Sequence, residues 1–223
     1  KPTVLTCRFP TFYGCLLQFG CKIMKSNLKV LRTEASIQNA FIKVCEKKGF
    51  TKMTINDIAT TASISRGTFY LHYVDKFDML KKYQTNLLCA VTDIFNNYPK
   101  PQTLETKEKY VGNQNAFYKL FDYLYSHRQL TNVLLQIPDS NIINRIKEII
   151  ANEIKANLTN KSRLNNNDII PTDYAREIIL QNILVIITFW LSKPSPEKPQ
   201  AAFDIFLKSR TLSPIDLLNV AYQ

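Results

Sequence analysis

The stretch that decides the fold is residues 54–76, which read TINDIATTASISRGTFYLHYVDK. It opens with a capping box, in which Thr54 is the N-cap and Asp57 occupies the third helical position. This pattern predicts a short helix that ends near Thr61 or Ala62. A tight turn follows and leads into a second short helix. Helix, turn and helix over 54–73 is the geometry of a DNA-binding motif, but also of an ordinary helical hairpin.

The residue types at the start of the second helix favour DNA binding. Small or hydrogen-bonding side chains occupy the positions from which a recognition helix reaches base edges in the major groove. They are Ser65, Arg66, Gly67 and Thr68. Inside a helix a glycine costs about 1 kcal/mol relative to alanine, so Gly67 is either a tolerated defect or serves close approach of the backbone to DNA.

The segments on both sides of this motif are also predicted to be helical. Residues 32–48 carry apolar side chains at helical spacing, and Gly49 stops that helix. A second capping box at 75–78 starts a long helix that ends before Pro99. Phe69 and Tyr73, four residues apart, are expected to pack inward, whereas Leu71 and His72 are expected on the opposite face.

Every periodic stretch beyond residue 101 is again helical, and no strand-like alternation of useful length occurs. The predicted helices are 104–126, 129–137, 139–158, 172–192 and 197–209. The helix at 172–192 is apolar almost all round, so one of its faces is expected to pack against a partner subunit. The sequence therefore predicts an all-α protein.

Composition and charge restrict the classes of function. The 223 residues are 45% hydrophobic, which is enough for a core, and the net charge of +11 leans toward the N-terminal half, which favours a polyanionic partner. Five cysteines without paired spacing argue against a zinc site or a disulfide framework. The apolar run at 178–191 is too short to span a bilayer, so we expect no membrane partner and a cytoplasmic protein.

Met24 is the expected natural start, with residues 1–23 an upstream extension outside the fold.

The motif resembles the N-terminal domain of the TetR/AcrR family of transcriptional regulators. The resemblance runs without a gap over residues 31–80, and its strongest part is Gly67–Lys76, GTFYLHYVDK, at the right distance from TINDIA at 54–59. It implies a three-helix DNA-binding domain at 24–78 and a helical domain at 79–223 that binds an effector and dimerises.

The resemblance also implies a set of DNA contacts. Bases would face the start of the second short helix, Ser65 to Thr68, and phosphates would be contacted by the residues Thr54, Tyr70, His72 and Lys76. A helix N-terminus attracts phosphate, and an arginine can bind guanine through two hydrogen bonds. Packing inside the protein remains an alternative role for Tyr70 and His72.

The C-terminal half of such regulators holds a small-molecule pocket and dimerises through its last two long helices. Candidate pocket residues, which fit ordinary core packing as well, are Tyr110, Phe117, Phe121, Tyr125, His127 and Trp190. Candidate dimer contacts are Ile183, Ile187, Trp190, Ala202 and Phe206. The end of the chain is loosely similar to the dihydroxyacetone kinase regulator subgroup, some members of which are activators that respond to a protein partner.

The sequence thus predicts a dimeric DNA-binding regulator, expected to be a repressor released from a palindromic operator by an unidentified small-molecule effector. The alternative is an activator or co-regulator of the same fold, controlled by a protein partner without a ligand. A protein-interaction module that has lost DNA binding is a further alternative, but the intact motif argues against it. The residues indicate no enzyme, metal or cofactor, because only His72 and His127 are available and no phosphate-binding loop occurs.

Overall fold

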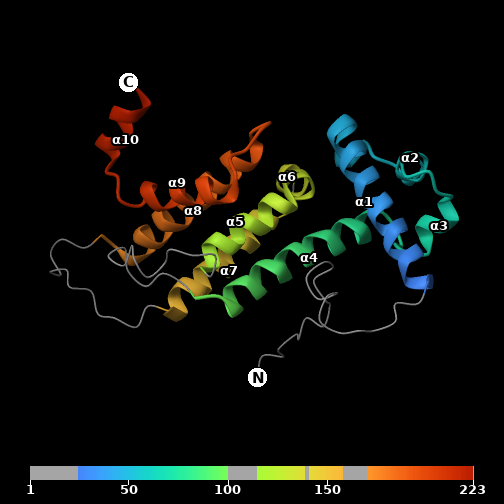
Figure 1. Ribbon diagram of the computed structural model, residues 1–223, viewed down its shortest axis with the longest axis horizontal. Helices are drawn as coiled ribbons and strands as arrows, with labels where there is room; N and C mark the ends of the chain where they lie inside the picture. Colours follow the sequence, from blue (N-terminus) through green and yellow to red (C-terminus); the bar gives the residue numbers. More distant parts are fainter. Residues whose placement is uncertain (1–24, 100–114, 139–140, 158–169, 223) are drawn as a thin grey trace. The chain divides into compact units, whose positions relative to one another are not determined.

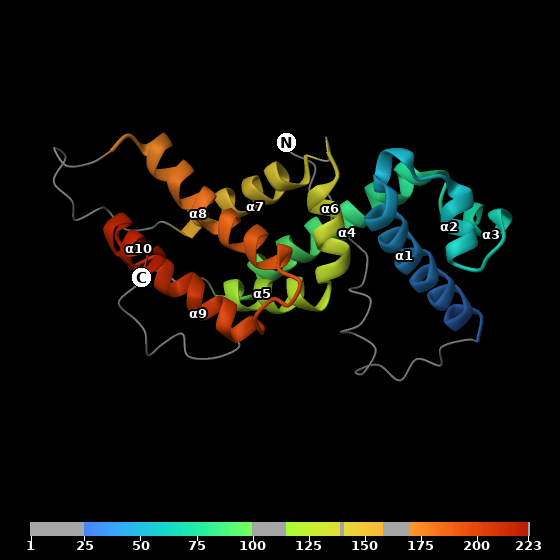
Figure 2. The same cartoon turned by 90° about the horizontal axis from the view of Figure 1, so that it is seen from above.

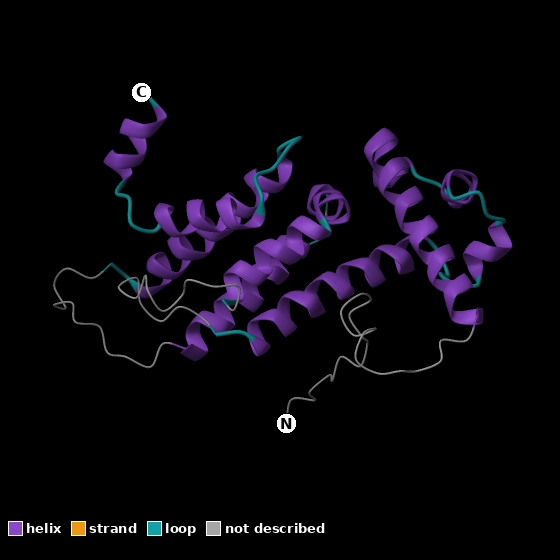
Figure 3. Cartoon of the chain, viewed as in Figure 1, coloured by secondary structure: helices purple, strands orange, loops and turns teal. Residues whose placement is uncertain are grey.

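The computed structural model describes residues 25–99, 115–138, 141–157 and 170–222, and every regular element in these ranges is a helix (Figures 1 and 3). The predicted all-α fold is therefore confirmed. The expected extension at 1–23 lies outside the described residues. The helices are α1 (Lys25–Lys52), α2 (Ile55–Thr61), α3 (Arg66–Tyr70), α4 (Lys76–Asn97), α5 (Ala116–Ser126), α6 (Arg128–Gln136), α7 (Ile142–Asn157), α8 (Thr172–Ser192), α9 (Pro199–Ser209) and α10 (Pro214–Ala221).

The chain divides into two compact units, residues 1–90 and 91–223. The division falls within α4, later than the expected boundary at 78/79. Met79 and Tyr83 explain the difference, because these α4 residues are buried and Tyr83 packs on Phe41 of α1 with ring centroids 5.2 Å apart. The first turns of α4 therefore belong to the core of the N-terminal unit.

The N-terminal unit packs α2 against α1 and α3 against α2, as both views show (Figures 1 and 2). Phe69 is fully buried and Tyr73 nearly so, which confirms the predicted inward face. The Tyr73 hydroxyl lies 3.5 Å from that of Tyr83, and burial raises the pKa of both phenols. This aromatic core fixes the second short helix to α4.

Helix α1 is longer than the predicted 32–48, but its expected stop is present. Gly49 has φ 76° and ψ 159°, a conformation that side chains other than glycine rarely adopt. The helical hydrogen bonding resumes only for the short turn that ends at Lys52. The glycine thus ends the long regular part of α1 and redirects the chain toward α2.

The C-terminal unit is built on an aromatic core contributed by α5, α8 and α9. Phe121 lies at its centre, with ring centroids 5.1 Å from Trp190 and 5.8 Å from Phe206. The bounds of α8 match the prediction. The predicted helix at 104–126 does not continue through Asn115, because that residue is extended and caps α5 by accepting hydrogen bonds from Phe117 and Tyr118. Helix α10 was not predicted.

Helix α8 is, by length and composition, apolar enough to cross a membrane, although the sequence run appeared too short. The core helix of a soluble protein meets the same criterion. In this unit α8 packs against α6 and α7 and buries six residues there and in the rest of the core. They are Leu180, Ile183, Leu184, Ile187, Trp190 and Leu191.

Candidate nucleic-acid interface

The N-terminus of α2 is held by the predicted capping box. The Thr54 N–H donates to the Asp57 carboxylate at 2.8 Å, and the Asp57 N–H donates to the Thr54 hydroxyl at 3.2 Å. The Lys48 ammonium lies 2.5 Å from the same carboxylate. Hydrogen bonds from Lys48 and Thr54 lower the pKa of Asp57 to about 2. Thr54 itself is exposed, as a phosphate contact requires.

The start of α3 is capped by Ser65, whose hydroxyl accepts from the Thr68 N–H at 3.0 Å. The two hydroxyls lie 2.9 Å apart. Arg66 and Gly67, the next two residues, are exposed, and within the described parts of the chain Arg66 forms no ion pair. Together these residues form one exposed edge with donors and acceptors for base edges, which we call the reading edge (residues 65–68).

The residues after the reading edge lie on different sides of the unit. The Tyr70 ring is half exposed and packs edge-on against Phe69 at 5.7 Å, so its hydroxyl is accessible. Leu71 is 85% exposed. Sequence reasoning placed Leu71 on the outer face but assigned it no role, although an exposed apolar side chain beside a reading edge suits contact with a thymine methyl group.

His72 faces α1 rather than solvent. Only 11% of its side chain is exposed, and its Nδ1 lies 3.5 Å from a carboxylate oxygen of Glu34. The expectation of an outward His72 is therefore corrected, since packing against α1 takes the ring away from a phosphate. This is the alternative role that the sequence left open.

Lys76 likewise has its partners inside the protein. Its ammonium donates to three backbone carbonyls, those of Phe50, Thr51 and Met53, at 3.2, 3.0 and 2.9 Å. An ammonium has three N–H donors, so this arrangement uses all of them. The phosphate contact expected of Lys76 has no free donor in this arrangement.

The second capping box is present in modified form. Asp75 accepts from the N–H groups of Phe77 and Asp78, at 2.8 and 2.7 Å, as an N-cap does. The Asp78 carboxylate, however, accepts from the Val74 N–H at 3.0 Å instead of from the N-cap residue. The Asp78 carboxylate therefore contacts the backbone of Val74, one residue before the predicted partner Asp75.

Among the described residues, none of the candidate pocket residues lines either of the two hollows described below. Phe117, Phe121 and Trp190 are buried in the aromatic core, and Tyr125 stacks on Trp190 with centroids 6.1 Å apart. His127 is exposed and stacks on Tyr123. Tyr110 lies outside the described residues. Large aromatic side chains at helical spacing fill the interior here, which was the alternative to a pocket.

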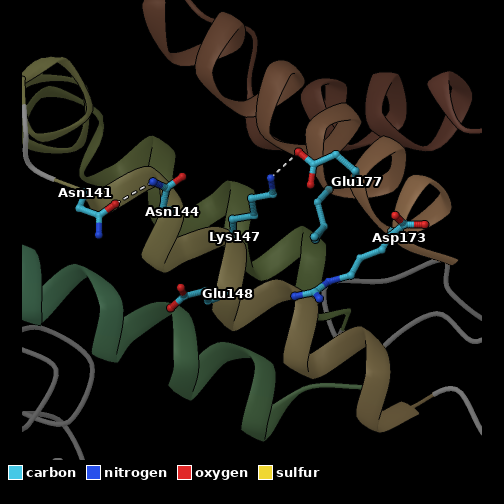
Figure 4. A pocket seen from close by; sticks show the side chains of 8 residues that line it. Asn141, Asn144, Lys147, Glu148, Asp173 and Glu177 are labelled. Atoms are coloured by element: carbon cyan, nitrogen blue, oxygen red, sulfur yellow. Dashed lines mark hydrogen bonds and ion pairs between the residues drawn. The ribbon is translucent and has the colours of Figure 1, made fainter.

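The described part of the C-terminal unit contains a polar cleft and a small apolar cavity. The polar cleft, of about 450 Å³, lies between α7 and α8, where Lys147 and Glu177 form an ion pair (Figure 4). The apolar cavity, of about 20 Å³, lies among the core helices and has room for about one water molecule. It is lined by Val91, Leu120, Leu124, Thr131, Leu135, Ile143, Ile146, Leu184, Ile187 and Thr188.

The residues expected from sequence at the dimer interface lie in the core of the C-terminal unit. Ile183, Ile187, Trp190, Ala202 and Phe206 are all buried within their own unit. The exposed apolar side chains of the same two helices lie at other positions, and we call one set of them the exposed stripe. The stripe comprises Tyr174, Ile178, Val185 and Phe189 of α8 and Ile205 of α9, whereas Ile179, also exposed, points to another side of α8.

Comparison with known proteins identifies the family. Residues 39–83 match the bacterial regulatory proteins of the tetR family, and residues 113–210 match a transcriptional regulator C-terminal region. The chain belongs to the TetR family. The two matches together include α2, α3 and the reading edge as well as helices α5 to α9.

Individual relatives agree with this assignment. An uncharacterised HTH-type transcriptional regulator of Bacillus subtilis, YxbF, is 32% identical over 81 residues. This match covers 36% of the chain but only 21% of YxbF, so the chain spans about a fifth of that relative.

Solved structures show the same fold. A TetR transcriptional regulator from Streptococcus agalactiae superimposes with a TM-score of 0.52 at 18% identity, over 82% of this chain and 96% of that one. The fatty acid degradation regulator FadR from Bacillus halodurans gives 0.51 at 20% identity, over 79% and 93%. FadR from Bacillus subtilis, solved in complex with stearoyl-CoA, gives 0.50 at 20% identity, over 78% and 96%.

Proposed function

We propose that the protein is a cytoplasmic, non-enzymatic TetR-family repressor that binds a palindromic operator as a dimer and is released by a small-molecule effector. The observation that carries DNA binding is the reading edge, which is capped, exposed and held on a buried aromatic core. Ser65, Arg66, Gly67 and Thr68 are the proposed base contacts. Thr54 and Tyr70, both exposed, are the proposed phosphate contacts.

The decisive side chain in this proposal is Arg66. A guanidinium that binds guanine through two hydrogen bonds contributes roughly 1–3 kcal/mol of discrimination against the wrong base. We therefore expect Arg66→Ala to lower operator affinity about 10- to 100-fold and to bring it closer to the affinity for unrelated DNA. Fluorescence anisotropy with DNA from upstream of the protein's own gene measures both affinities.

Arg145→Ala is the matched control, because Arg145 is an exposed arginine of α7 in the other unit. Equal operator affinities for the Arg66 and Arg145 variants would contradict the base contact. Failure of the unmodified protein to bind that DNA and neighbouring promoters at low salt would instead favour a protein-interaction module.

Dimerisation is assigned to the exposed stripe. Its four α8 residues lie at spacings of four, seven and four, so they share one face along most of the helix. Exposed apolar patches of this kind mark interaction surfaces. A dimer is required by the target, since two recognition helices must lie about one turn of DNA apart, roughly 34–36 Å, to read a palindrome.

The effector is proposed to be apolar, because the small core cavity is lined almost entirely by apolar side chains. Drug-sized ligands occupy roughly 300–1,000 Å³, so binding must open this core, and the altered packing would change how the two subunits present their reading edges. Stearoyl-CoA, the ligand in the Bacillus subtilis FadR structure, is the first compound to test.

Trp190 reports on such binding. It is the only tryptophan of the chain, it is 3% exposed, and its indole N–H donates to the Glu197 carbonyl at 3.0 Å. An effector that opens the core is expected to shift the Trp190 emission and to release operator DNA over the same concentration range. Release of DNA without any change in emission would place the effector elsewhere.

A further inference from the structure

The first two turns of α4 carry two lysines that hold backbone carbonyls from other segments of the N-terminal unit. Lys76 holds the end of α1, through the carbonyls of Phe50, Thr51 and Met53. Its ammonium also lies 5.1 Å from the centre of the Phe50 ring and 5.4 Å from that of Phe77, within the range of cation–π attraction. Lys76 is thus enclosed by carbonyls and aromatic faces.

These carbonyls lie where α1 ends, and the Phe50 carbonyl also accepts from the Met53 N–H at 3.2 Å. The last carbonyls of a helix have no partner within it, and a lysine at that end both satisfies them and interacts favourably with the helix dipole. The break at Gly49 leaves only one further turn, which includes Phe50 and Thr51. Lys76 therefore fastens the segment that leads directly into the capping box of α2.

Lys82 makes the corresponding contact at the other end of the motif. Its ammonium donates to the His72 carbonyl at 2.9 Å and lies 3.2 Å from the Asp78 carboxylate. It also lies 4.8 Å from the centre of the Tyr73 ring. His72 follows α3 by two residues, so Lys82 fastens the segment that leaves the recognition helix.

The two lysines are six residues apart, which corresponds to about 9 Å along the α4 axis. One holds the chain where it enters the helix-turn-helix, and the other holds it where it leaves. The connection does not depend on the side chains of the reading edge. Charged hydrogen bonds, which are stronger than neutral ones, thus connect both ends of the helix-turn-helix to α4.

We propose that Lys76 and Lys82 are positioning residues for DNA recognition, which hold both ends of the helix-turn-helix on α4 and so fix the angle of the reading edge. The proposal rests on the proposed DNA-binding function. A positioning role can be distinguished from a phosphate contact by the lysine. A phosphate contact strengthens binding to every DNA sequence, whereas a correctly oriented reading edge strengthens binding to the operator alone.

The test replaces each lysine by methionine, which keeps a flexible apolar chain and removes the ammonium. Operator and unrelated DNA are titrated over a range of salt concentrations, with the active protein fraction determined by stoichiometric titration. Lys76→Met and Lys82→Met are each expected to lower the ratio of operator to unrelated-DNA affinity about 10-fold or more. A merely structural role lowers the active fraction and leaves this ratio unchanged.

Lys81→Met is the matched control, because it removes the same charge from an exposed position of the same helix. It is expected to keep the affinity ratio. If Lys76→Met or Lys82→Met instead lowers both affinities equally and reduces the salt slope by about one, that lysine is a phosphate contact and the proposal fails. If a methionine variant does not fold, arginine at the same position retains the charge, but its planar fork fits converging carbonyls poorly, so a partial loss of the ratio is expected.

A second measurement does not involve DNA. In the free, unmodified protein labelled with ¹⁵N-lysine, the Lys76 ammonium protons are expected to exchange slowly with water at low temperature, unlike those of Lys81. Rapid exchange at Lys76 would overturn its positioning role even if the protein binds its operator. Slow exchange at Lys76 in a protein that binds no DNA would retain that role and reject the proposed function.

Discussion

Gly67 is the residue for which the sequence left two interpretations, a tolerated defect or close approach to DNA. A Cβ added there would meet only the Ser65 hydroxyl, at 3.6 Å, which is ordinary van der Waals contact. Nothing within the protein therefore requires a glycine at this position, and its presence in a helix costs about 1 kcal/mol relative to alanine. The proposed function supplies a reason for the glycine, namely close approach of the backbone of the reading edge to DNA, which the next experiment tests.

We predict that Gly67→Ala stabilises the N-terminal unit by about 0.5–1 kcal/mol and lowers operator affinity at least several-fold. The added methyl group favours the helix but separates the backbone from the base edges. Urea unfolding and anisotropy titrations on the same preparation measure the two effects. A more stable variant with unchanged operator affinity would make Gly67 a tolerated defect.

At the same scale, the sequence predicted what local spacing determines. The exposed start of the second short helix, the cap Thr54 and the inward Phe69 all follow from patterns within a few residues. The roles of His72 and Lys76 did not, because their partners lie on α1, 38 and 26 residues earlier in the case of Glu34 and Phe50. No local pattern indicates that a lysine at a helix start is used by distant carbonyls.

At the scale of the helix, the start of α2 depends directly on a titratable group. The pKa of Asp57 is lowered from 3.8 to about 2 in the folded protein. A depressed carboxyl pKa stabilises the fold at pH values above the unfolded value, and this stabilisation is lost as the pH falls through the folded value. The relevant window is therefore from about pH 4 to about pH 2.

We predict that α2 becomes easier to unfold across this window and that Asp57→Asn removes much of the dependence while destabilising α2 at neutral pH. Urea titrations followed by the NMR signal of the buried Ile58 methyl group measure the local stability at each pH. Glu46→Gln, an exposed substitution on α1, is the control. A pH dependence that persists unchanged in Asp57→Asn would assign it to other carboxylates.

The prediction of elements failed where capping signals were overlooked. Asn115 precedes an apolar run and is the N-cap of α5, so α5 begins after this residue. Helix α10 opens with Ser213, Pro214 and Asp216, a capping box with proline at the first helical position. Both patterns are recognisable starts of helices, and both were present in the sequence.

For the molecule as a whole, the sequence could not determine which face of α8 is exposed. A helix that is apolar almost all round has no sequence pattern that marks its inner side. The buried face with Ile183 and Ile187 therefore looks the same in the sequence as the exposed face with Val185 and Phe189. Only the packing of α8 against α6, α7 and the aromatic core distinguishes them.

We predict that Val185→Glu makes the protein monomeric and abolishes high-affinity operator binding. A carboxylate in the middle of the exposed stripe would have to be buried at the interface without a partner. Sedimentation velocity gives the oligomeric state. Ile179→Glu is the matched control, since Ile179 is also exposed but lies about 100° round α8 from Ile178. A dimeric Val185→Glu protein would exclude this face as the interface.

The exposed stripe makes the stability of the protein depend on its concentration in the cell. If a second copy covers Tyr174, Ile178, Val185 and Phe189, part of the folding free energy belongs to association, and it grows with protomer concentration. The melting temperature then falls on dilution, and freshly made chains are most exposed to proteolysis while they are scarce. Occupancy of a palindromic site consequently rises more steeply than in proportion to the amount of regulator.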